Sequence, residues 1–535
     1  EGFVTESRYD GVGNVVATVA YAERALTGAD AFVPAASAKD QLTVLQYDRV
    51  NRLVERTDAE GYVTRWKYDA VGNRIEQRLY LDRTDRANPL LQQVTVTDYD
   101  RMSRVVLERS ALGLETHYAY DKRGNRTTQI EAFGTAAQRS TLYTYDAADR
   151  LRTVTEAAGT ADAVVTYRDL DNAGRLVGQT RAYGTAQARS ETWEYDDADR
   201  RTLHSRADGT VEKTEYDALG NVQRRIDALG TSDQRSTHFA YDRTNRLVAA
   251  TVGEGRPEAL ITRYAYDAFG NRTREAVAEG TPDARVTLNA YDRLDRLIAS
   301  TDGNLVVTLN DYDAFGNRVR TRIAGTTLRA DGTVVQRTDA MHFEYDRLNL
   351  LTGETDGVGH TIQRVYDGAG NLQLQIDAAG LLEARRTEFR FDLGNRLTDK
   401  IVDPQGLRIA THYDYDERGN LLAQTNADGL ISTTRFDALD RAVVTTDAEG
   451  FSVSFTYDRF GNQTSITTGQ YLVAVGAVGY DAAKAARALV ATTRLSYDSM
   501  DRKTLQADAL GTVTRYSYDK RGNRSSQVEG FGFIA

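Results

Sequence analysis

The chain has 535 residues, a net charge of −10 and an isoelectric point near 5.4. This acidic balance argues against a general nucleic-acid binder, which would carry a basic domain or stripe. The chain has no cysteine, which excludes a disulfide framework and a thiolate metal site. No apolar run approaches about 18 residues, so no membrane-spanning helix is predicted.

The first predicted element is a turn that begins at a Tyr-Asp pair, Tyr9 and Asp10, and has the form YDxxGN. Along the whole chain this form alternates with a second form, YDxxNR or YDxxDR. Regular alternation over the full length indicates a repeat array. The first form begins at Tyr9, Tyr68, Tyr120, Tyr216, Tyr266, Tyr312, Tyr366, Tyr415, Tyr457 and Tyr518, with a degenerate copy at Leu170–Arg175. The second begins at Tyr47, Tyr99, Tyr145, Tyr195, Tyr241, Tyr291, Tyr345, Phe391, Phe436 and Tyr497.

A strand is predicted before each turn. Aromatic residues two positions apart, such as Tyr264 and Tyr266, would share one face of a strand. We expect that face to be buried or stacked on neighbouring aromatics. At the other end of each repeat, stretches such as Asp508–Thr512 are typical of hairpin turns. The predicted fold is all-β, with tandem YD-repeat β-hairpins forming one continuous antiparallel strip.

The turn residues themselves predict backbone conformation. In Tyr266–Asn271 the carboxylate of Asp267 can accept a hydrogen bond from the backbone two residues on. Gly270 suits the left-handed residue of a type I turn with a G1 bulge. The second form should then carry residues that tolerate positive φ at this position, as Asn and Asp do. Those residues are Asn51, Asp149, Asp199, Asn245, Asp295, Asn349, Asn395, Asp440 and Asp501, with Ser103 as the weak fit.

We interpret the motif as a structural corner and predict no catalytic, cofactor-binding or metal-binding residue, and no cofactor. The structural repeat motif is represented by Tyr68, Asp69, Gly72, Asn73, Tyr120, Asp121, Gly124, Asn125, Tyr266, Asp267, Gly270, Asn271, Tyr312, Asp313, Gly316, Asn317, Tyr518, Asp519, Gly522 and Asn523.

The other sequence features that could indicate a metal site or a catalytic site are explained by the repeat or lack a required residue. Four histidines stand three residues before the tyrosine of a Tyr-Asp pair, which argues against a zinc site; they are His117, His238, His342 and His412. Asp169–Gly174 resembles the start of a calcium loop, but the twelfth position holds Thr180 instead of glutamate. A GxSxG elbow and a P-loop are both missing from the sequence.

Four insertions interrupt the array, at residues 22–41, 80–93, 322–338 and 469–495. The first reads as a loop with room for one helical turn. The last contains good helix formers after Asp481, an N-cap candidate, which predicts a short helix. The sequence DPQGL at Asp403–Leu407 reads as an ordinary turn with proline at its second position.

These motifs resemble the YD-repeat, or Rhs-repeat, family from Tyr9 to Asn523. Its members include the core of Rhs polymorphic toxins, the BC component of insecticidal toxin complexes and the shell of teneurins. The resemblance implies a β-strip wound into a hollow spiral barrel, tube or cocoon. In the toxins this shell holds an effector domain, and in teneurins it supports adhesion. The Rhs core ends in a DPxGL-type motif near a cleavage site, whereas five more repeats follow Leu407 here.

We therefore expect a single YD-repeat array over residues 1–535, a non-enzymatic shell that encapsulates a cargo or toxin polypeptide in a bacterial secreted or cell-surface protein. The expected partners are that polypeptide, neighbouring repeat segments and, end to end, further copies, without nucleic acid. The chain opens and closes within turn regions, so we expect it to be a window on a longer protein. The alternative is an extracellular adhesion or filament protein built from the repeats themselves.

Overall fold

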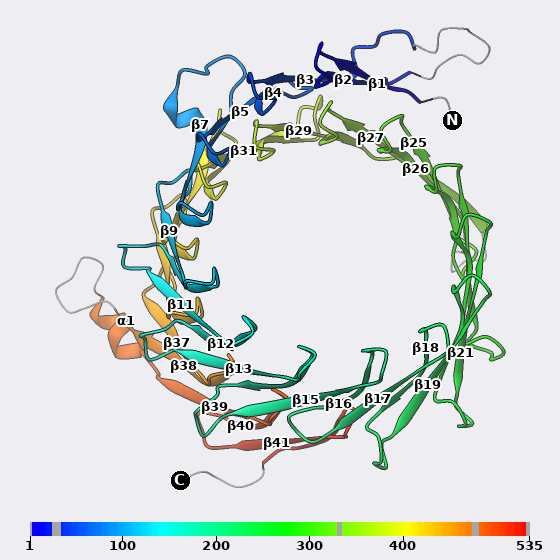
Figure 1. Cartoon of the computed structure of the whole chain (residues 1–535), viewed down its shortest axis with the longest axis vertical. Coiled ribbons are helices and arrows are strands. Elements are labelled where there is room, and N and C mark those ends of the chain that lie inside the picture. The colour runs from blue at the N-terminus through cyan, green and yellow to red at the C-terminus, as the bar shows by residue number, and fades with distance from the viewer. Residues whose placement is uncertain (1–2, 24–33, 329–333, 473–480, 531–535) are drawn as a thin grey trace. The chain divides into compact units, whose positions relative to one another are not determined.

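The computed structural model describes residues 3–23, 34–328, 334–472 and 481–530. The chain divides into two compact units, residues 1–114 with 261–411 and residues 115–260 with 412–535. Each unit contains two strips of consecutive strands, in which every strand pairs antiparallel with the next one in sequence (Figure 1). The predicted all-β, antiparallel hairpin architecture is confirmed within each unit.

In unit 1 the first strip, strip 1a, consists of β1 (Thr5–Tyr9), β2 (Val15–Ala20), β3 (Gln41–Tyr47), β4 (Leu53–Thr57), β5 (Val63–Tyr68), β6 (Arg74–Tyr80), β7 (Gln92–Tyr99) and β8 (Val105–Arg109). The second strip, strip 1b, consists of β21 (Leu260–Tyr266), β22 (Arg272–Val277), β23 (Arg285–Tyr291), β24 (Leu297–Thr301), β25 (Val307–Tyr312), β26 (Arg318–Leu328), β27 (Val334–Tyr345), β28 (Leu351–Thr355), β29 (Thr361–Tyr366), β30 (Leu372–Asp377), β31 (Arg385–Phe391) and β32 (Leu397–Val402).

In unit 2 the first strip, strip 2a, consists of β9 (Glu115–Tyr120), β10 (Arg126–Glu131), β11 (Arg139–Tyr145), β12 (Leu151–Glu156), β13 (Val164–Leu170), β14 (Leu176–Arg181), β15 (Arg189–Tyr195), β16 (Arg201–Ser205), β17 (Val211–Tyr216), β18 (Val222–Asp227), β19 (Arg235–Tyr241) and β20 (Leu247–Val252). The second strip, strip 2b, consists of β33 (Ile409–Tyr415), β34 (Leu421–Thr425), β35 (Ile431–Phe436), β36 (Ala442–Thr446), β37 (Phe451–Tyr457), β38 (Gln463–Tyr471), β39 (Ala491–Tyr497), β40 (Lys503–Ala507), β41 (Val513–Tyr518) and β42 (Arg524–Val528).

The hairpin between β21 and β22 has the geometry predicted from its sequence. The N–H of Asp267 donates to the carbonyl of Asn271 at 3.0 Å, and the N–H of Gly270 donates to the carbonyl of Asp267 at 3.3 Å. Gly270 has a φ of 98°, and the register shifts between Ala265 and Tyr266. This shift is the bulge expected when a left-handed residue closes a type I turn.

The predicted positive φ of the second turn form is confirmed at every copy, including the weak fit Ser103. These residues have φ values between 58° and 64°; they are Asn51, Ser103, Asp149, Asp199, Asn245, Asp295, Asn349, Asn395, Asp440 and Asp501. This position can therefore hold any residue that tolerates the left-handed region. The choice between asparagine and aspartate decides which hydrogen bonds the side chain makes, as described below.

The distal turns, at the opposite edge of each strip, include a type that the sequence interpretation missed. Six alanines have φ between 48° and 55°, namely Ala132, Ala157, Ala182, Ala228, Ala278 and Ala378. In the first of these turns the N–H of Thr135 donates to the carbonyl of Ala132 at 3.2 Å. Ala157, Ala182 and Ala228 are buried. The recurring A-x-G-T sequence could have revealed this second turn type.

The insertions differ in kind. Residues 80–93 contain a 3-10 helix, η1 (Pro89–Leu91), capped by Asn88. Residues 322–328 and 334–338 extend strands β26 and β27 into a longer hairpin. The predicted helix is confirmed as α1 (Ala482–Arg487), with Asp481 as its N-cap. The helical turn considered within residues 22–41 falls on residues 24–33, which lie outside the described residues.

Candidate functional site

In the first turn form the aspartate carboxylate joins the two ends of the turn. In Tyr266–Asn271 the Oδ1 atom of Asp267 accepts hydrogen bonds from the backbone N–H groups of Phe269 and Asn271, both at 2.9 Å. Its Oδ2 atom accepts from the side-chain Nδ2 of Asn271 at 3.0 Å. The aspartate and asparagine, which could be taken for catalytic groups, are therefore hydrogen-bonded to each other within the turn.

In the second form an arginine side chain, in place of asparagine, donates the hydrogen bond to Oδ2 of the aspartate. In the turn after β23, Oδ1 of Asp292 accepts from the N–H groups of Leu294 and Arg296 at 2.9 and 3.0 Å. Oδ2 of Asp292 accepts from Nε of Arg296 at 2.7 Å. The degenerate turn at Leu170–Arg175 follows this second pattern, because Nε of Arg175 donates to Asp171 at 2.7 Å.

The alternation of the two forms has a physical reason, because each form donates to the next. Nδ2 of Asn271 uses its second hydrogen to donate to Oδ1 of Asp295, the left-handed residue of the following turn, at 2.7 Å. Nη1 of Arg296 donates to the backbone carbonyl of Asp313 in the turn after that, at 2.9 Å. Successive turns along this edge are thus linked by a chain of hydrogen bonds to which both forms contribute.

The motif tyrosines add a second link between consecutive turns. The hydroxyl of Tyr312 donates to the carbonyl of Leu297 at 2.9 Å, and the guanidinium of Arg296 lies 4.9 Å from the centre of the Tyr312 ring. The same pairing joins Arg52 to Tyr68 and Arg502 to Tyr518. In these three pairs a cation lies over the ring face, whereas Tyr167 stacks on the neighbouring aromatic Tyr183, with ring centres 4.8 Å apart.

The structure places the predicted motif residues at five separate turns and does not bring them together. In each of the five, Nδ2 of the asparagine donates to Oδ2 of the aspartate, over 2.8 Å for Asn73 and Asp69, 3.0 Å for Asn125 and Asp121, 3.0 Å for Asn271 and Asp267, 3.0 Å for Asn317 and Asp313, and 2.8 Å for Asn523 and Asp519. The five glycines, Gly72, Gly124, Gly270, Gly316 and Gly522, all have positive φ. A structural role for the motif remains our proposal, supported by this geometry.

Acidification is expected to unfold the protein, because the motif carboxylates are stabilised in their charged form. The side-chain hydrogen bond from Asn73 lowers the pKa of Asp69, and that from Arg200 lowers the pKa of Asp196. A lowered folded-state pKa contributes stability above the ordinary aspartate value of about 3.9, and this stability is lost as pH falls below it. The urea midpoint, followed by circular dichroism, should therefore fall between pH 7 and pH 3, and an unchanged midpoint would contradict this prediction.

In unit 2 the left-handed aspartates of strip 2b, Asp440 and Asp501, also bind the other strip. Oδ2 of Asp440 in strip 2b accepts from Nη1 of Arg139 in strip 2a at 2.5 Å, and Oδ1 accepts from Nε of Arg418 and Nδ2 of Asn420, both at 2.7 Å. Nη1 of Arg418 donates to the carbonyl of Ala137 at 2.6 Å. Arg189 of strip 2a donates in the same way to Asp501 of strip 2b.

In unit 1 the corresponding contacts between the strips join neutral side chains. Nε2 of Gln41 donates to Oδ1 of Asn349 at 2.8 Å, and Nε2 of Gln93 donates to Oδ1 of Asn395 at 2.6 Å. These glutamines, like Arg139 and Arg189, stand six residues before the aromatic of a second-form turn, a place that we call the entry position. The entry position and the left-handed residue are functional positions that sequence reasoning missed, and the recurring Gln or Arg at the entry position was the available signal.

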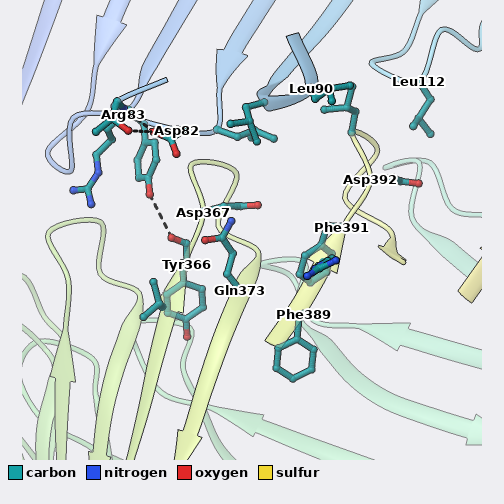
Figure 2. Close-up of a pocket in the computed structure, with 17 residues that line it drawn as sticks. Asp82, Arg83, Leu90, Leu112, Tyr366, Asp367, Gln373, Phe389, Phe391 and Asp392 are labelled. Carbon is teal, nitrogen blue, oxygen red and sulfur yellow. Dashed lines mark hydrogen bonds between the residues drawn. The ribbon is translucent and has the colours of Figure 1, made fainter. Parts of the chain in front are cut away.

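A cavity of about 740 Å³ lies between the two strips of unit 1 (Figure 2). Leu90 and Leu112 of strip 1a line it opposite Phe389 and Phe391 of strip 1b. Its carboxylates are already engaged, since Asp392 binds Arg396 in its own turn. The cavity therefore presents apolar side chains and satisfied polar groups, which is typical of an imperfect packing gap.

The described residues contain no group of three or more histidine, cysteine, aspartate or glutamate side chains placed to hold a metal ion. His117, one of the four histidines at a shared repeat position, stacks on Phe133 and lies 2.8 Å from the carboxylate of Glu115. Among the described helices none has both the length and the apolar character needed to cross a bilayer.

The fold and the turns define a class of protein, a tandem array of β-hairpins whose recurring chemistry lies at the hairpin corners. Four stretches of the chain, residues 47–79, 216–257, 391–431 and 436–472, match the RHS repeat family. These four stretches are RHS repeats, as the motif resemblance predicted.

Solved structures of the same fold include toxin components. The chain is similar to the crystal structure of TcdB2-TccC3, with a TM-score of 0.52 and 14% identity over 97% of this chain and 30% of the other. It is also similar to the Photorhabdus luminescens Tc holotoxin pore with a mutated TccC3, with a TM-score of 0.53 and 13% identity over 98% of this chain and 32% of the other. At such low identity the likeness shows the fold alone. The chain spans about a third or less of the length of the chains that it matches. No curated protein matches the chain.

Proposed function

We propose that the chain is a segment of an RHS-repeat shell that encloses a cargo polypeptide. The observation that carries this proposal is the edge-to-edge contact of two strips within each unit. The contacting residues are between 276 and 312 positions apart in sequence, from Ala438 with Asp162 to Arg189 with Asp501. Strips of one chain that meet earlier strips at such similar intervals are suited to build a continuous wall.

The chemistry of these contacts supports a wall that stays closed. In unit 2 they include charge-assisted hydrogen bonds, such as those of Arg139 and Arg418 with Asp440, which are stronger than neutral ones. In unit 1 the hydroxyl of Tyr62 donates to the carbonyl of Tyr366 at 3.3 Å, and Nε of Arg347 donates to Glu60 at 3.1 Å. Such contacts would hinder the strips from separating and admitting proteases.

The likeness to TcdB2-TccC3 and to the Tc holotoxin pore supports a toxin-related shell in a bacterial secreted protein. The proposed role is mechanical, because the recurring aspartates, asparagines and arginines are used within the turns and between the strips. A shell of this kind needs no bound cofactor and no reaction centre. Its specificity would lie in what the wall encloses.

The test is protease protection in the longest native protein that contains this chain. We expect an enclosed polypeptide to resist cleavage while the shell is folded and to become cleavable in denaturant below the concentration that unfolds the cargo alone. Electron microscopy of the same sample should show density enclosed by the wall. An empty interior, with end-to-end filaments in the images, would reject encapsulation and favour a structural filament.

A further inference from the structure

The cavity between strips 1a and 1b combines the lining of a packing gap with the size of a ligand site (Figure 2). Its volume of about 740 Å³ lies within the range of roughly 300–1,000 Å³ that is typical of small-molecule pockets. Both of its walls belong to described strands and turns of unit 1. The cavity is therefore formed by parts of this chain that already contact each other.

One wall of the cavity is the insertion at residues 80–93, which has a fixed shape. The N–H of Leu81 donates to the carbonyl of Leu91 at 2.9 Å and closes the insertion into a loop. Gln92 is only 8% exposed, and its Nε2 donates to the carbonyl of Arg86 at 2.8 Å. These bonds hold the loop in place against the opposite strip.

Leu90 of this loop is a large apolar side chain that remains in contact with solvent. It is 76% exposed although it lines the cavity. Leu112 of strip 1a and Phe389 and Phe391 of β31 line the same cavity (Figure 2). Exposed apolar surface gathered in a hollow is a mark of ligand binding. A molecule that fills the cavity would remove Leu90 from water, and this burial would stabilise binding.

The three carboxylates that line the cavity are hydrogen-bonded within their own turns. Oδ1 of Asp82 accepts from the N–H and the hydroxyl of Thr84 at 2.6 and 2.7 Å. Oδ2 of Asp367 accepts from Nδ2 of Asn371 at 3.0 Å, and Asp392 is likewise bound within its turn. A cationic ligand would therefore have to displace existing bonds.

The two arginines of the lining do not favour an anionic ligand either. Nη1 of Arg83 donates to the backbone carbonyl and to the carboxylate of Glu60, at 3.0 and 3.3 Å. Arg390 stands between Phe389 and Phe391 in β31, so its side chain leaves the opposite face of the strand. A negatively charged group among the two phenylalanine rings would therefore gain little from either guanidinium.

Gln373 supplies one neutral polar group. Its side chain lines the cavity from β30, together with Phe389 and Phe391 of β31 (Figure 2). Over the part of the chain that the structure describes, its amide forms no hydrogen bond with another residue. A side-chain amide can both donate to and accept from a hydroxyl group. The lining thus offers apolar surface and one uncharged hydrogen-bonding partner.

We propose that this cavity binds an uncharged small amphiphile, an apolar chain with one neutral polar end, such as a long-chain alcohol. The chain lies among Leu90, Leu112, Phe389 and Phe391, and the polar end forms a hydrogen bond with Gln373. Because the two walls belong to strips 1a and 1b, the bound molecule also holds these strips together. This inference does not depend on the proposed encapsulation.

Calorimetric titration of the folded chain with decanol, decanoate and decylamine at neutral pH tests the class of ligand. Decanol should bind at least roughly tenfold more tightly than the two charged molecules, because a charged end would lose water without gaining a partner. Hydrogen exchange at Leu81 and Gly368 should slow when decanol binds, since the N–H of Gly368 donates to the carbonyl of Leu81 across the two walls. No binding of decanol, or tighter binding of either charged molecule, would overturn the proposal.

Two variants of exposed lining residues locate the site. Leu90→Ser should weaken decanol binding roughly tenfold, because the apolar contact is lost. Gln373→Leu should weaken it roughly fivefold, because the alcohol loses its hydrogen bond. Leu510, which is 84% exposed and lies outside the cavity in unit 2, provides the control, and Leu510→Ser should bind decanol like the wild type.

Circular dichroism establishes that each variant is folded before its binding is compared. Unchanged decanol binding in both cavity variants would place the molecule elsewhere and reject the site. An equal loss of binding in Leu510→Ser would show general adsorption to exposed leucines and would reject it as well.

Discussion

Replacing Gly368 by alanine is expected to lower the free energy of unfolding by about 2 kcal/mol, because the added methyl group has no room. A Cβ at this position would lie 2.5 Å from Cδ1 of Tyr62 and 2.8 Å from the carbonyl of Tyr80. Both neighbours belong to strip 1a, so the methyl group would push the two strips of unit 1 apart. The N–H of Gly368, which donates to the carbonyl of Leu81 at 3.2 Å, would lose that bond.

Gly11 provides the matched control, since it occupies the same place in another YDGxGN turn. A Cβ at Gly11 would meet nothing within 4 Å, and its φ is not positive. Gly11→Ala should therefore leave stability unchanged or raise it by up to about 1 kcal/mol, through the reduced freedom of the unfolded chain. Urea unfolding measures both variants, and hydrogen exchange at Leu81 and Gly368 reports strip separation. An equal effect of the two substitutions would refute the strip contact.

The same two glycines show what the sequence can and cannot predict. The local conformation of both turns follows from their residues, because the aspartate carboxylate, the positive φ and the strand alternation act within six residues. The residues that surround the turn at Gly368 cannot be predicted in this way, because Tyr62 is 306 positions away in the sequence. With some twenty similar turns available, sequence alone cannot select which one meets Tyr62.

The pentapeptide DALGT shows a second limit. At Asp227 it ends a strand, and Ala228 adopts a φ of 51° in the longer distal turn. At Asp508 it begins a short turn in which the N–H of Gly511 donates to the carbonyl of Asp508 at 3.1 Å. Five identical residues thus adopt two turns, because the number of residues before the next strand differs. Strand β19 begins at Arg235 after the first copy, whereas β41 begins at Val513 directly after the second.

Positive φ explained why only Asn, Asp and once Ser occupy the left-handed position, but not the choice among them. The strip contacts supply that explanation. Where the entry position holds arginine, as at Arg139, its partner is aspartate, and where it holds glutamine, as at Gln41, its partner is asparagine. A charged side chain opposite a neutral amide would lose the oppositely charged hydrogen-bond partner that offsets its partial burial. The residues at the entry position and at the left-handed position are therefore expected to depend on each other.

That coupling predicts the result of exchanging the unit 2 pair for the unit 1 pair. Asp440→Asn should lower the free energy of unfolding by about 2 kcal/mol, because Arg139 and the nearly buried Arg418 both lose a carboxylate. Arg139→Gln should cost about 1 kcal/mol, since Asp440 keeps Arg418 as its partner. The double variant should be more stable than the sum of the single effects predicts, by about 1 kcal/mol, as the glutamine and asparagine can then bond as Gln41 and Asn349 do over 2.8 Å.

A double-mutant cycle in urea, read by circular dichroism and repeated at high salt, measures this coupling. Salt should reduce the cost of the single variants, because both pairs are partly exposed and screened, and should leave the double variant nearly unaffected. Asp199, also a left-handed aspartate of unit 2, is held by Arg175 within its own strip and serves as the control. Pairing Asp199→Asn with Arg139→Gln should give additive effects, because no contact joins these two described residues. Additivity in the Arg139 and Asp440 cycle itself would mean that the strips are aligned by other contacts.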